Sequence, residues 1–262
     1  MDGQYPLLRA REIGVVAALL RECRGILSWS GWRELKSKGG RRLFELRHGE
    51  RRIILVVAGM GAKRARSSAR FLVEEFCPEV LVCVGFCGAL DPSLRVGEVV
   101  EAKELFIWRG PGRLVPGPRT VGPTLHRALK EVTMVSCVEF AAKERLSEDL
   151  QGSSFPGTVD LETSFVAEVA FQEGKGFLAI KAVSDEAELD PSARVNHWVD
   201  SEFRIRPYRV LLSFLKRPSW LADAWRLFLR SKIASVNLGE TLRGLLVPGC
   251  EIRRDLTRAF HF

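Results

Sequence analysis

The sequence has little that could hold a metal ion. Its four histidines are His48, His126, His197 and His261. They are scattered along the chain and form no ligand pattern. Six cysteines are present, but Cys83 and Cys87 flank "VGF", a spacing that does not match a zinc site. We therefore expect no metal and no other cofactor, and we interpret the cysteines as buried free thiols because unpaired cysteine packs as a small hydrophobic residue.

Long apolar runs are also missing. No window reaches the roughly 18 uninterrupted apolar residues of a membrane-spanning helix. The first residues, "MDGQYPLLRAREIGVV", lack the basic-then-apolar order of a signal peptide, so we expect a cytoplasmic protein. The chain has 262 residues, of which 46% are apolar, and shows no internal repeat. That composition suits one large α/β domain, alone or with an appendage.

The positive charge is confined to the end of the chain. Residues 203–262 hold 12 Lys or Arg and 4 Asp or Glu, which accounts for the whole net charge of +8. Residues 1–202 are therefore neutral overall. This distribution argues against a general nucleic-acid surface on the main part of the chain, and we expect no nucleic-acid partner.

Apolar segments alternate with helical segments through the neutral part. We predict strands in residues 12–20, 51–62, 78–90, 133–140 and 176–184, a turn and strand in 91–105, and helices in 63–76 and 162–172. Gly174 is placed to end the second helix. Such alternation favours an α/β sheet that is covered on both faces, with ligands at the carboxyl ends of its strands. The Pro/Gly-rich segment 108–123 is expected to be an exposed, mobile loop.

Several motifs stand in a fixed order. The run "LVVAGMGAKRARSSARFLVEEFCPEVLVCVGFCGALDPSLRVGEVVEAKEL", followed by "VDLET" and "VSDEA", resembles the nucleoside phosphorylase and nucleosidase family. The resemblance covers about residues 13–190 and is strongest to methylthioadenosine/S-adenosylhomocysteine nucleosidases and their hopanoid-associated relatives. It implies a three-layer α/β sandwich with a mixed central sheet, a catalytic domain in residues 1–202, and basic helices in the extension 203–262. It also implies a nucleoside substrate, a homo-oligomer and a place in methionine salvage.

The resemblance assigns roles to three acidic residues. The Glu of the family's "VDMEG" stretch, which grips the ribose hydroxyls, corresponds to Glu162 in "VDLET". The Asp of its "ISD" stretch, which handles the purine N7, corresponds to Asp185, with Ser184 beside it. The Glu that activates water corresponds to Glu22 in "GVVAALLRE".

The same resemblance names residues that would line the substrate site. They are Phe140 in "SCVEFA", stacking on the base, and Leu161, Phe86, Gly85, Gly59 and Gly61 around the nucleoside. The two last glycines, in "GMGA", would permit close approach of the backbone. Each residue also has an ordinary structural interpretation: a helix-start acid, a turn residue, a solvated acid or a core aromatic.

These residue types suit cleavage of a ribosyl–purine bond. The sugar passes through an oxocarbenium-like state, which a carboxylate such as Glu162 stabilises. A partly buried Asp185 with a raised pKa would protonate the leaving base, and Glu22 would take a proton from water. The sequence thus predicts a purine ribonucleosidase acting on a 5′-modified adenosine.

Two other functions stay open. Cys83 and Phe86 stand where family members carry Arg and Ser phosphate contacts, which favours water over phosphate as nucleophile. A phosphorylase nevertheless remains an alternative, because Arg21 and Arg24 near the first turn could hold an anion. A nucleoside-binding or membrane-associated protein without turnover is a third hypothesis.

The tail carries an amphipathic pattern. Leu221, Ala224, Trp225 and Phe228 recur at helical spacing in "PSWLADAWRLFLRSK", with arginines off that stripe. A helix of this kind either packs on the main domain or a second subunit, or lies in an anionic membrane interface through residues 208–232. The second interpretation, together with a resemblance of the tail to the hopanoid-associated members, makes a lipid-linked adenosine such as adenosylhopane an alternative substrate.

Overall fold

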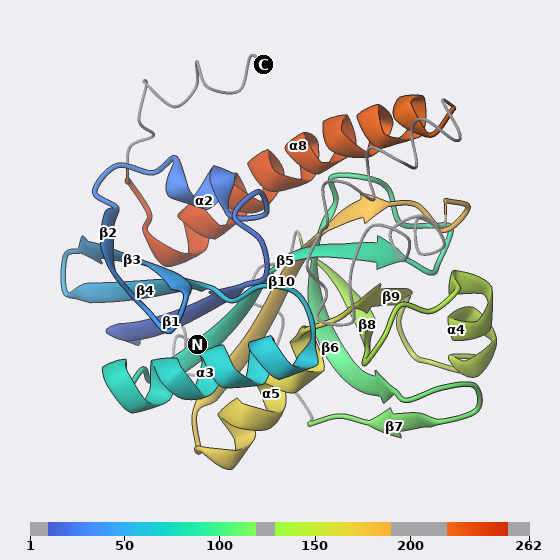
Figure 1. Cartoon of the computed structure of the whole chain (residues 1–262), viewed down its shortest axis with the longest axis horizontal. Coiled ribbons are helices and arrows are strands. Elements are labelled where there is room, and N and C mark those ends of the chain that lie inside the picture. Colours follow the sequence, from blue (N-terminus) through green and yellow to red (C-terminus); the bar gives the residue numbers. More distant parts are fainter. Residues whose placement is uncertain (1–9, 119–128, 190–218, 251–262) are drawn as a thin grey trace.

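A mixed sheet between two layers of helices makes up the body of the protein (Figure 1). The computed structural model describes residues 10–118, 129–189 and 219–250. The strands there are β1 (Glu12–Ala17), β2 (Arg33–Lys38), β3 (Arg41–His48), β4 (Arg51–Val57), β5 (Val80–Ala89), β6 (Val99–Trp108), β7 (Leu114–Pro116), β8 (Lys130–Cys137), β9 (Gly157–Asp160) and β10 (Gly176–Asp185). The helices are α2 (Arg24–Leu27), α3 (Ala62–Phe76), α4 (Lys143–Asp149), α5 (Thr163–Gln172) and α8 (Ser219–Leu246).

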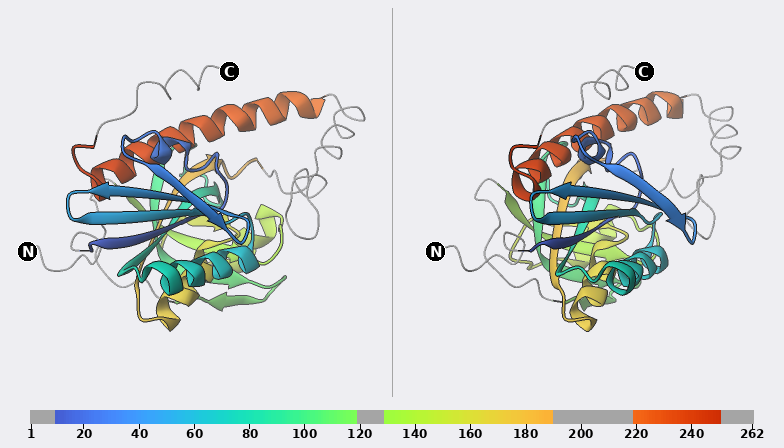
Figure 2. Two further views of the ribbon diagram at one scale, coloured as in Figure 1. Left: turned by 60° about the vertical axis from the view of Figure 1, so that its left-hand side comes forward. Right: turned by 90° about the vertical axis from the view of Figure 1, so that its left-hand side faces the viewer.

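The helices cover both faces of the sheet. Figure 2 shows α3 and α5 on one face and α2 with α8 on the other. Side chains from each layer join a separate buried apolar cluster with the strands. This is the three-layer α/β sandwich that the sequence predicted.

The strand order brings three chain segments to one edge of the sheet. The order is β10-β6-β8-β9-β5-β1-β4-β3-β2, and β10 also pairs with β5, so that β5, β10, β6, β8 and β9 close into a circuit. β1, β5 and β10 are parallel neighbours. Their carboxyl ends therefore lie together, which is where ligands bind in sheets of this kind.

Some predicted elements need correction. The first strand ends at Ala17 rather than at residue 20, and the second ends before the "GMG" turn. The segment 108–123 is not wholly a loop, because Leu114–Pro116 forms β7 against β6. Cys77 is exposed in a left-handed helix cap, whereas the other five cysteines are buried free thiols as predicted.

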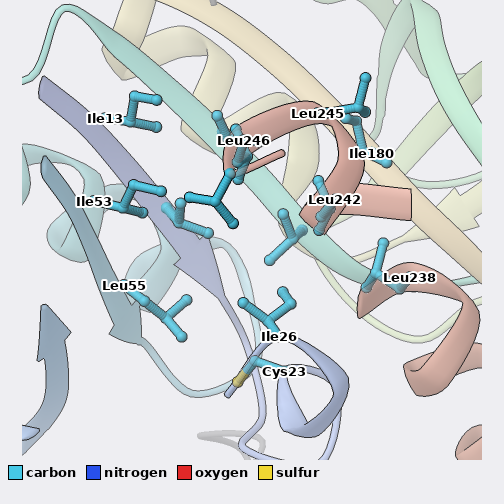
Figure 3. Packing of buried hydrophobic residues seen from close by; sticks show 14 of the residues in the cluster. Ile13, Cys23, Ile26, Ile53, Leu55, Ile180, Leu238, Leu242, Leu245 and Leu246 are labelled. Carbon is cyan, nitrogen blue, oxygen red and sulfur yellow. The ribbon is translucent and has the colours of Figure 1, made fainter. Parts of the chain in front are cut away.

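The long C-terminal helix α8 contributes one of its faces to the core. Figure 3 shows Leu238, Leu242, Leu245 and Leu246 packed toward Ile26 of α2 and the sheet. The helices cross at two glycines: a Cβ on Gly239 would lie 2.4 Å from the backbone carbon of Gly25. This close packing holds the C-terminal half of α8 against α2 and the sheet.

The predicted domain boundary at residue 202 lies outside the described residues. So do residues 208–218 of the segment 208–232 that the sequence connects with membranes, and the structure describes no side chains for 219–227. Among the described residues no helix is long and apolar enough to span a membrane.

Candidate functional site

Glu22 is held in the turn after β1. Its Oε2 accepts hydrogen bonds from the N–H groups of Ala18 and Leu19, at 3.2 and 3.1 Å. The side chain is buried, and burial raises the pKa of Glu22 against the opposing effect of Lys181. A proton-accepting group is thus fixed by its own turn at the ligand edge of the sheet.

Gly85 makes room for this carboxyl in the neighbouring strand β5. Its φ is +142°, and a Cβ there would lie 2.7 Å from Glu22 Oε2 and 3.6 Å from Lys181 Nζ. Any other residue would push against the carboxyl and strain the backbone. Gly85 therefore permits Glu22 and Lys181 to approach one another.

Glu162 sits at the start of α5 and points to the turn before α3. Its Oε1 accepts the Gly61 N–H at 2.8 Å, so that it links two helix starts. Burial, with the neighbouring carboxylate of Asp160, raises the pKa of Glu162 to about 8. The group can therefore exist protonated or ionised near neutral pH.

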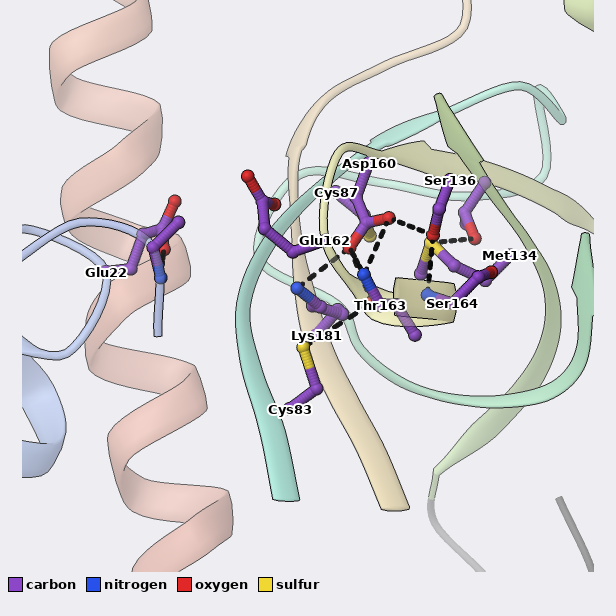
Figure 4. Close-up of polar contacts among 12 residues, drawn as sticks. Glu22, Cys83, Cys87, Met134, Ser136, Asp160, Glu162, Thr163, Ser164 and Lys181 are labelled. Carbon is purple, nitrogen blue, oxygen red and sulfur yellow. Dashed lines mark hydrogen bonds and ion pairs between the residues drawn. The ribbon is translucent and has the colours of Figure 1, made fainter. Parts of the chain in front are cut away.

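Lys181 and Asp160 form an enclosed ion pair beside these glutamates (Figure 4). The Nζ–Oδ2 distance is 2.9 Å, and both side chains are 2% exposed. Asp160 also accepts hydrogen bonds from Thr163 and Ser136. Burial alone would lower the pKa of Lys181, but Cys83 and the surrounding carboxyls raise it well above its ordinary value. Lys181 is a permanent cation of the cluster.

Asp185 ends β10 and forms a second buried ion pair. Its Oδ2 lies 2.5 Å from Lys143 Nζ of α4, and its Oδ1 accepts the Ser184 hydroxyl at 2.6 Å. A Cβ on Gly88 of β5 would lie 2.8 Å from Asp185 Oδ2. A glycine in β5 thus accommodates each of the two acidic sites, Gly85 for Glu22 and Gly88 for Asp185.

Cys87 lies between the two ion pairs. Burial raises the pKa of its thiol, and both Lys181–Asp160 and Lys143–Asp185 act on that thiol electrostatically. The carboxyl group of Glu22 acts in turn on Glu162. The groups on β5, on β10, in the turn after β1 and at the start of α5 therefore form one connected buried site.

The remaining predicted residues surround it. Leu161 is buried, and Phe140 packs on the same apolar cluster as Leu161 together with Leu146 of α4. Phe86 is partly buried against the cluster on the opposite side of the sheet. Gly59 has φ +85° beside the Arg64 side chain. The base-stacking role of Phe140 stays a prediction.

Three charged residues of the site were missed from the sequence. Lys181 stands alone in the apolar run "GFLAIKAVS", and a single charge in a buried strand is itself a signal for a buried partner. Asp160 precedes Glu162 by two residues and could have been found the same way. Lys143 carries no comparable signal, since exposed charged residues follow it in α4.

The arrangement can support acid–base chemistry on a sugar–base bond. Glu22 and Glu162 are carboxyls with raised pKa values on one side, and Asp185 forms an ion pair with Lys143 on the other. Such a pair of opposed groups is what general acid–base cleavage requires. Within the described residues no cluster of His, Cys, Asp or Glu side chains is arranged to hold a metal ion.

The sequence pattern of the Phosphorylase superfamily matches residues 12–216, most of the chain. The chain belongs to this family. A 5′-methylthioadenosine/S-adenosylhomocysteine nucleosidase of Marinomonas sp. (strain MWYL1) is 26% identical over 198 residues, which cover 67% of this chain and 86% of that protein. One of Staphylococcus epidermidis is 25% identical over 167 residues, 55% and 72% of the two chains. Family membership establishes a nucleosidase or a closely related nucleoside phosphorylase, as the sequence predicted.

Solved structures confirm the fold. A 5′-methylthioadenosine/S-adenosylhomocysteine nucleosidase of Helicobacter pylori superposes with a TM-score of 0.68 at 16% identity, covering 90% of this chain and 97% of its own. A futalosine hydrolase of the same organism also gives a TM-score of 0.68, at 15% identity and with the same coverage. At these identities the likeness concerns the fold alone.

Proposed function

We propose that the protein is a purine ribonucleosidase that uses water to cleave the N-glycosidic bond of a 5′-modified adenosine. The observation that carries the proposal is the approach of Glu22 and Lys181 at Gly85, where both also act electrostatically on the Glu162 carboxyl, with Asp185 at the end of the adjoining strand. The relatives named as 5′-methylthioadenosine/S-adenosylhomocysteine nucleosidases support this substrate class.

Each carboxyl has a distinct task in the proposed reaction. Glu162 in its ionised form accepts hydrogen bonds from the ribose hydroxyls and offsets the developing charge on the sugar. Glu22 takes the proton of the attacking water. Asp185 directs a proton to the purine N7, so that the base departs neutral. Ser184 holds the second oxygen of Asp185, and Phe140, Leu161 and Phe86 bound the nucleoside.

The charges of the site favour water over phosphate. Glu22, Glu162 and Asp160 surround Lys181, whose charge Asp160 already neutralises. A phosphate dianion would meet a lysine whose charge is already compensated, beside carboxyls that repel it in their ionised forms. Arg21 and Arg24 are exposed, although the charge of Arg21 acts on Glu22, so a phosphorylase stays the alternative.

A product assay tests the proposal. Purified full-length protein is incubated with 5′-methylthioadenosine in phosphate-free buffer and in phosphate, and adenine and the sugar product are separated by chromatography. We expect adenine and free methylthioribose in both buffers. Strict dependence on phosphate, with a sugar 1-phosphate product, would make the protein a phosphorylase, and no adenine in either buffer would favour a binding protein.

A lipid-linked adenosine is a second candidate substrate. α8 exposes Leu229, Ile233 and Val236, at 43%, 52% and 40%, along one side of the helix. Removing α8 would destroy the core, so the test uses the full chain with Ile233→Gln and Leu229→Gln. Loss of co-sedimentation with anionic vesicles in this variant, with adenine release from 5′-methylthioadenosine unchanged, would support a membrane contact. The homo-oligomer and the cytoplasmic location stay predictions.

A further inference from the structure

Lys143 is the only cation that the described residues bring into contact with the Asp185 carboxylate. Lys143 is the first residue of α4, and none of the three acidic motifs includes it. Its side chain is 7% exposed, and that of Asp185 is 8% exposed. Burying a lysine costs free energy unless it is paired, so this position is held by its partner.

The contacts of Lys143 point in one direction. Its Nζ lies 2.5 Å from Asp185 Oδ2 and donates to the Glu186 carbonyl at 2.7 Å and to the Asp185 carbonyl at 3.4 Å. The apolar stem passes Gly88, where a Cβ would lie 3.1 Å from Lys143 Cε. The ammonium is therefore fixed on the end of β10, and Ser184 occupies the other carboxylate oxygen.

Lys143 Nζ and Asp185 Oδ2 are close enough for a proton to pass between them. A departing purine needs a proton at N7, and a carboxylate held in an ion pair must first receive one from its partner. We propose that Lys143 is a positioning residue that supplies this proton through Asp185. The inference rests on the proposed function and adds to it the source of the proton.

The step balances as follows. The C1′–N9 bond breaks, and its electron pair passes to the purine ring. A proton moves from Lys143 Nζ to the Asp185 carboxylate, and the carboxylic acid so formed gives a proton to N7, which leaves Asp185 ionised as before. Water forms the new C1′–O bond and gives its proton to Glu22. Solvent then returns a proton to the neutral amine of Lys143 and takes one from Glu22, which restores the starting state.

Two substitutions separate proton supply from charge. Lys143→Met keeps the stem and removes the proton, whereas Lys143→Arg keeps the charge and the hydrogen bonds but cannot be deprotonated. The matched control is Arg145→Met, an exposed residue of the same helix. Adenine release from 5′-methylthioadenosine is compared with release of 2-fluoroadenine from its 2-fluoro derivative, a better leaving group that needs less protonation.

We expect both Lys143 variants to release adenine about 10²-fold more slowly, near the lower end for general acid catalysis. The loss on the 2-fluoro substrate should be much smaller, and Arg145→Met should match the wild type on both. Thermal melting checks that the variants fold. Wild-type rates in Lys143→Arg would overturn proton supply, and equal losses on both substrates would reduce Lys143 to a structural role. A wild-type protein that releases no base at all would instead defeat the proposed function itself.

Discussion

Two Lys–Asp pairs lie in the same site, and one of them is buried more deeply than the other. Lys181–Asp160 is closed inside the strand circuit, with both side chains 2% exposed. Lys143–Asp185 lies at a strand end, with side chains 7% and 8% exposed. The chemical groups are the same, so the difference lies in their surroundings.

The partners explain what each pair can do. Asp160 is saturated by Thr163, Ser136 and Lys181, all from strands or a helix start in the core. Lys143 donates to the carbonyl of Glu186, a partly exposed residue directly after β10. The inner pair is therefore suited to hold the sheet and orient Glu162, and the outer pair to exchange a proton.

The largest effect is expected when the acid of the outer pair is removed. Asp185→Asn should lower turnover by about 10²–10⁴, because the amide cannot pass a proton to the base. The fold should persist, since Asn still accepts a hydrogen bond from Lys143. Steady-state adenine release measures this, with Glu188→Gln, an exposed neighbour, as control. Near-normal turnover would remove Asp185 from the mechanism.

The inner pair, Lys181–Asp160, should matter more than the outer pair for stability, whereas the outer pair should matter more for turnover. Lys181→Met leaves Asp160 buried without its cation and should cost about 3–5 kcal/mol in the free energy of unfolding. Lys143→Met should cost clearly less, because the Asp185 side chain is 8% exposed, against 2% for Asp160, and water can reach it more readily. Urea unfolding of both variants gives the comparison. Equal losses would mean that depth does not separate the pairs.

Glu162 tests the sugar side. Glu162→Gln should lower turnover by about 10²–10³, because a neutral amide cannot offset the ribosyl cation. The variant should also lose most of the preference for 5′-methylthioadenosine over its 2′-deoxy analogue. Glu173→Gln, an exposed residue at the other end of α5, is the control. A ribo/deoxy ratio unchanged from the wild type would show that Glu162 does not bind the ribose.

The sequence predicted the elements and residues that carry a strong local pattern. Continuous apolar strands such as β5 and β10 were found because they are buried on both faces. The hairpin of β2 and β3 was missed, since β2 is a charged, exposed edge strand, "RELKSK", without an apolar run. The four-residue β9 is too short to show a period.

The site was predictable to the extent that motifs mark it. Glu22, Glu162 and Asp185 lie at strand or helix ends in recognisable motifs, and the structure brings them to one edge. Lys143 pairs with Asp185 only because the chain folds back over 42 positions. Nothing in "AAKERL" distinguishes this buried lysine from its exposed neighbours, so tertiary packing alone reveals it.

The smallest expected effect concerns pH and the inner cluster. In the folded state burial and Asp160 raise the pKa of Glu162 to about 8, against 4.5 for the free group. Between these values the folded protein holds a proton that the unfolded chain has lost. The stabilisation is therefore complete below about pH 4.5 and disappears as pH rises through 8.

Glu162→Gln removes this titration. The melting temperature of the wild type should fall between pH 5 and pH 8 relative to that of the variant, by a few degrees. Glu188→Gln should follow the wild type, because it leaves Glu162 and its neighbours in place. If the melting temperatures of wild type and Glu162→Gln change with pH in parallel, Glu162 is not the group with the raised pKa. Glu22 would then be the next residue to substitute, because burial raises its pKa too.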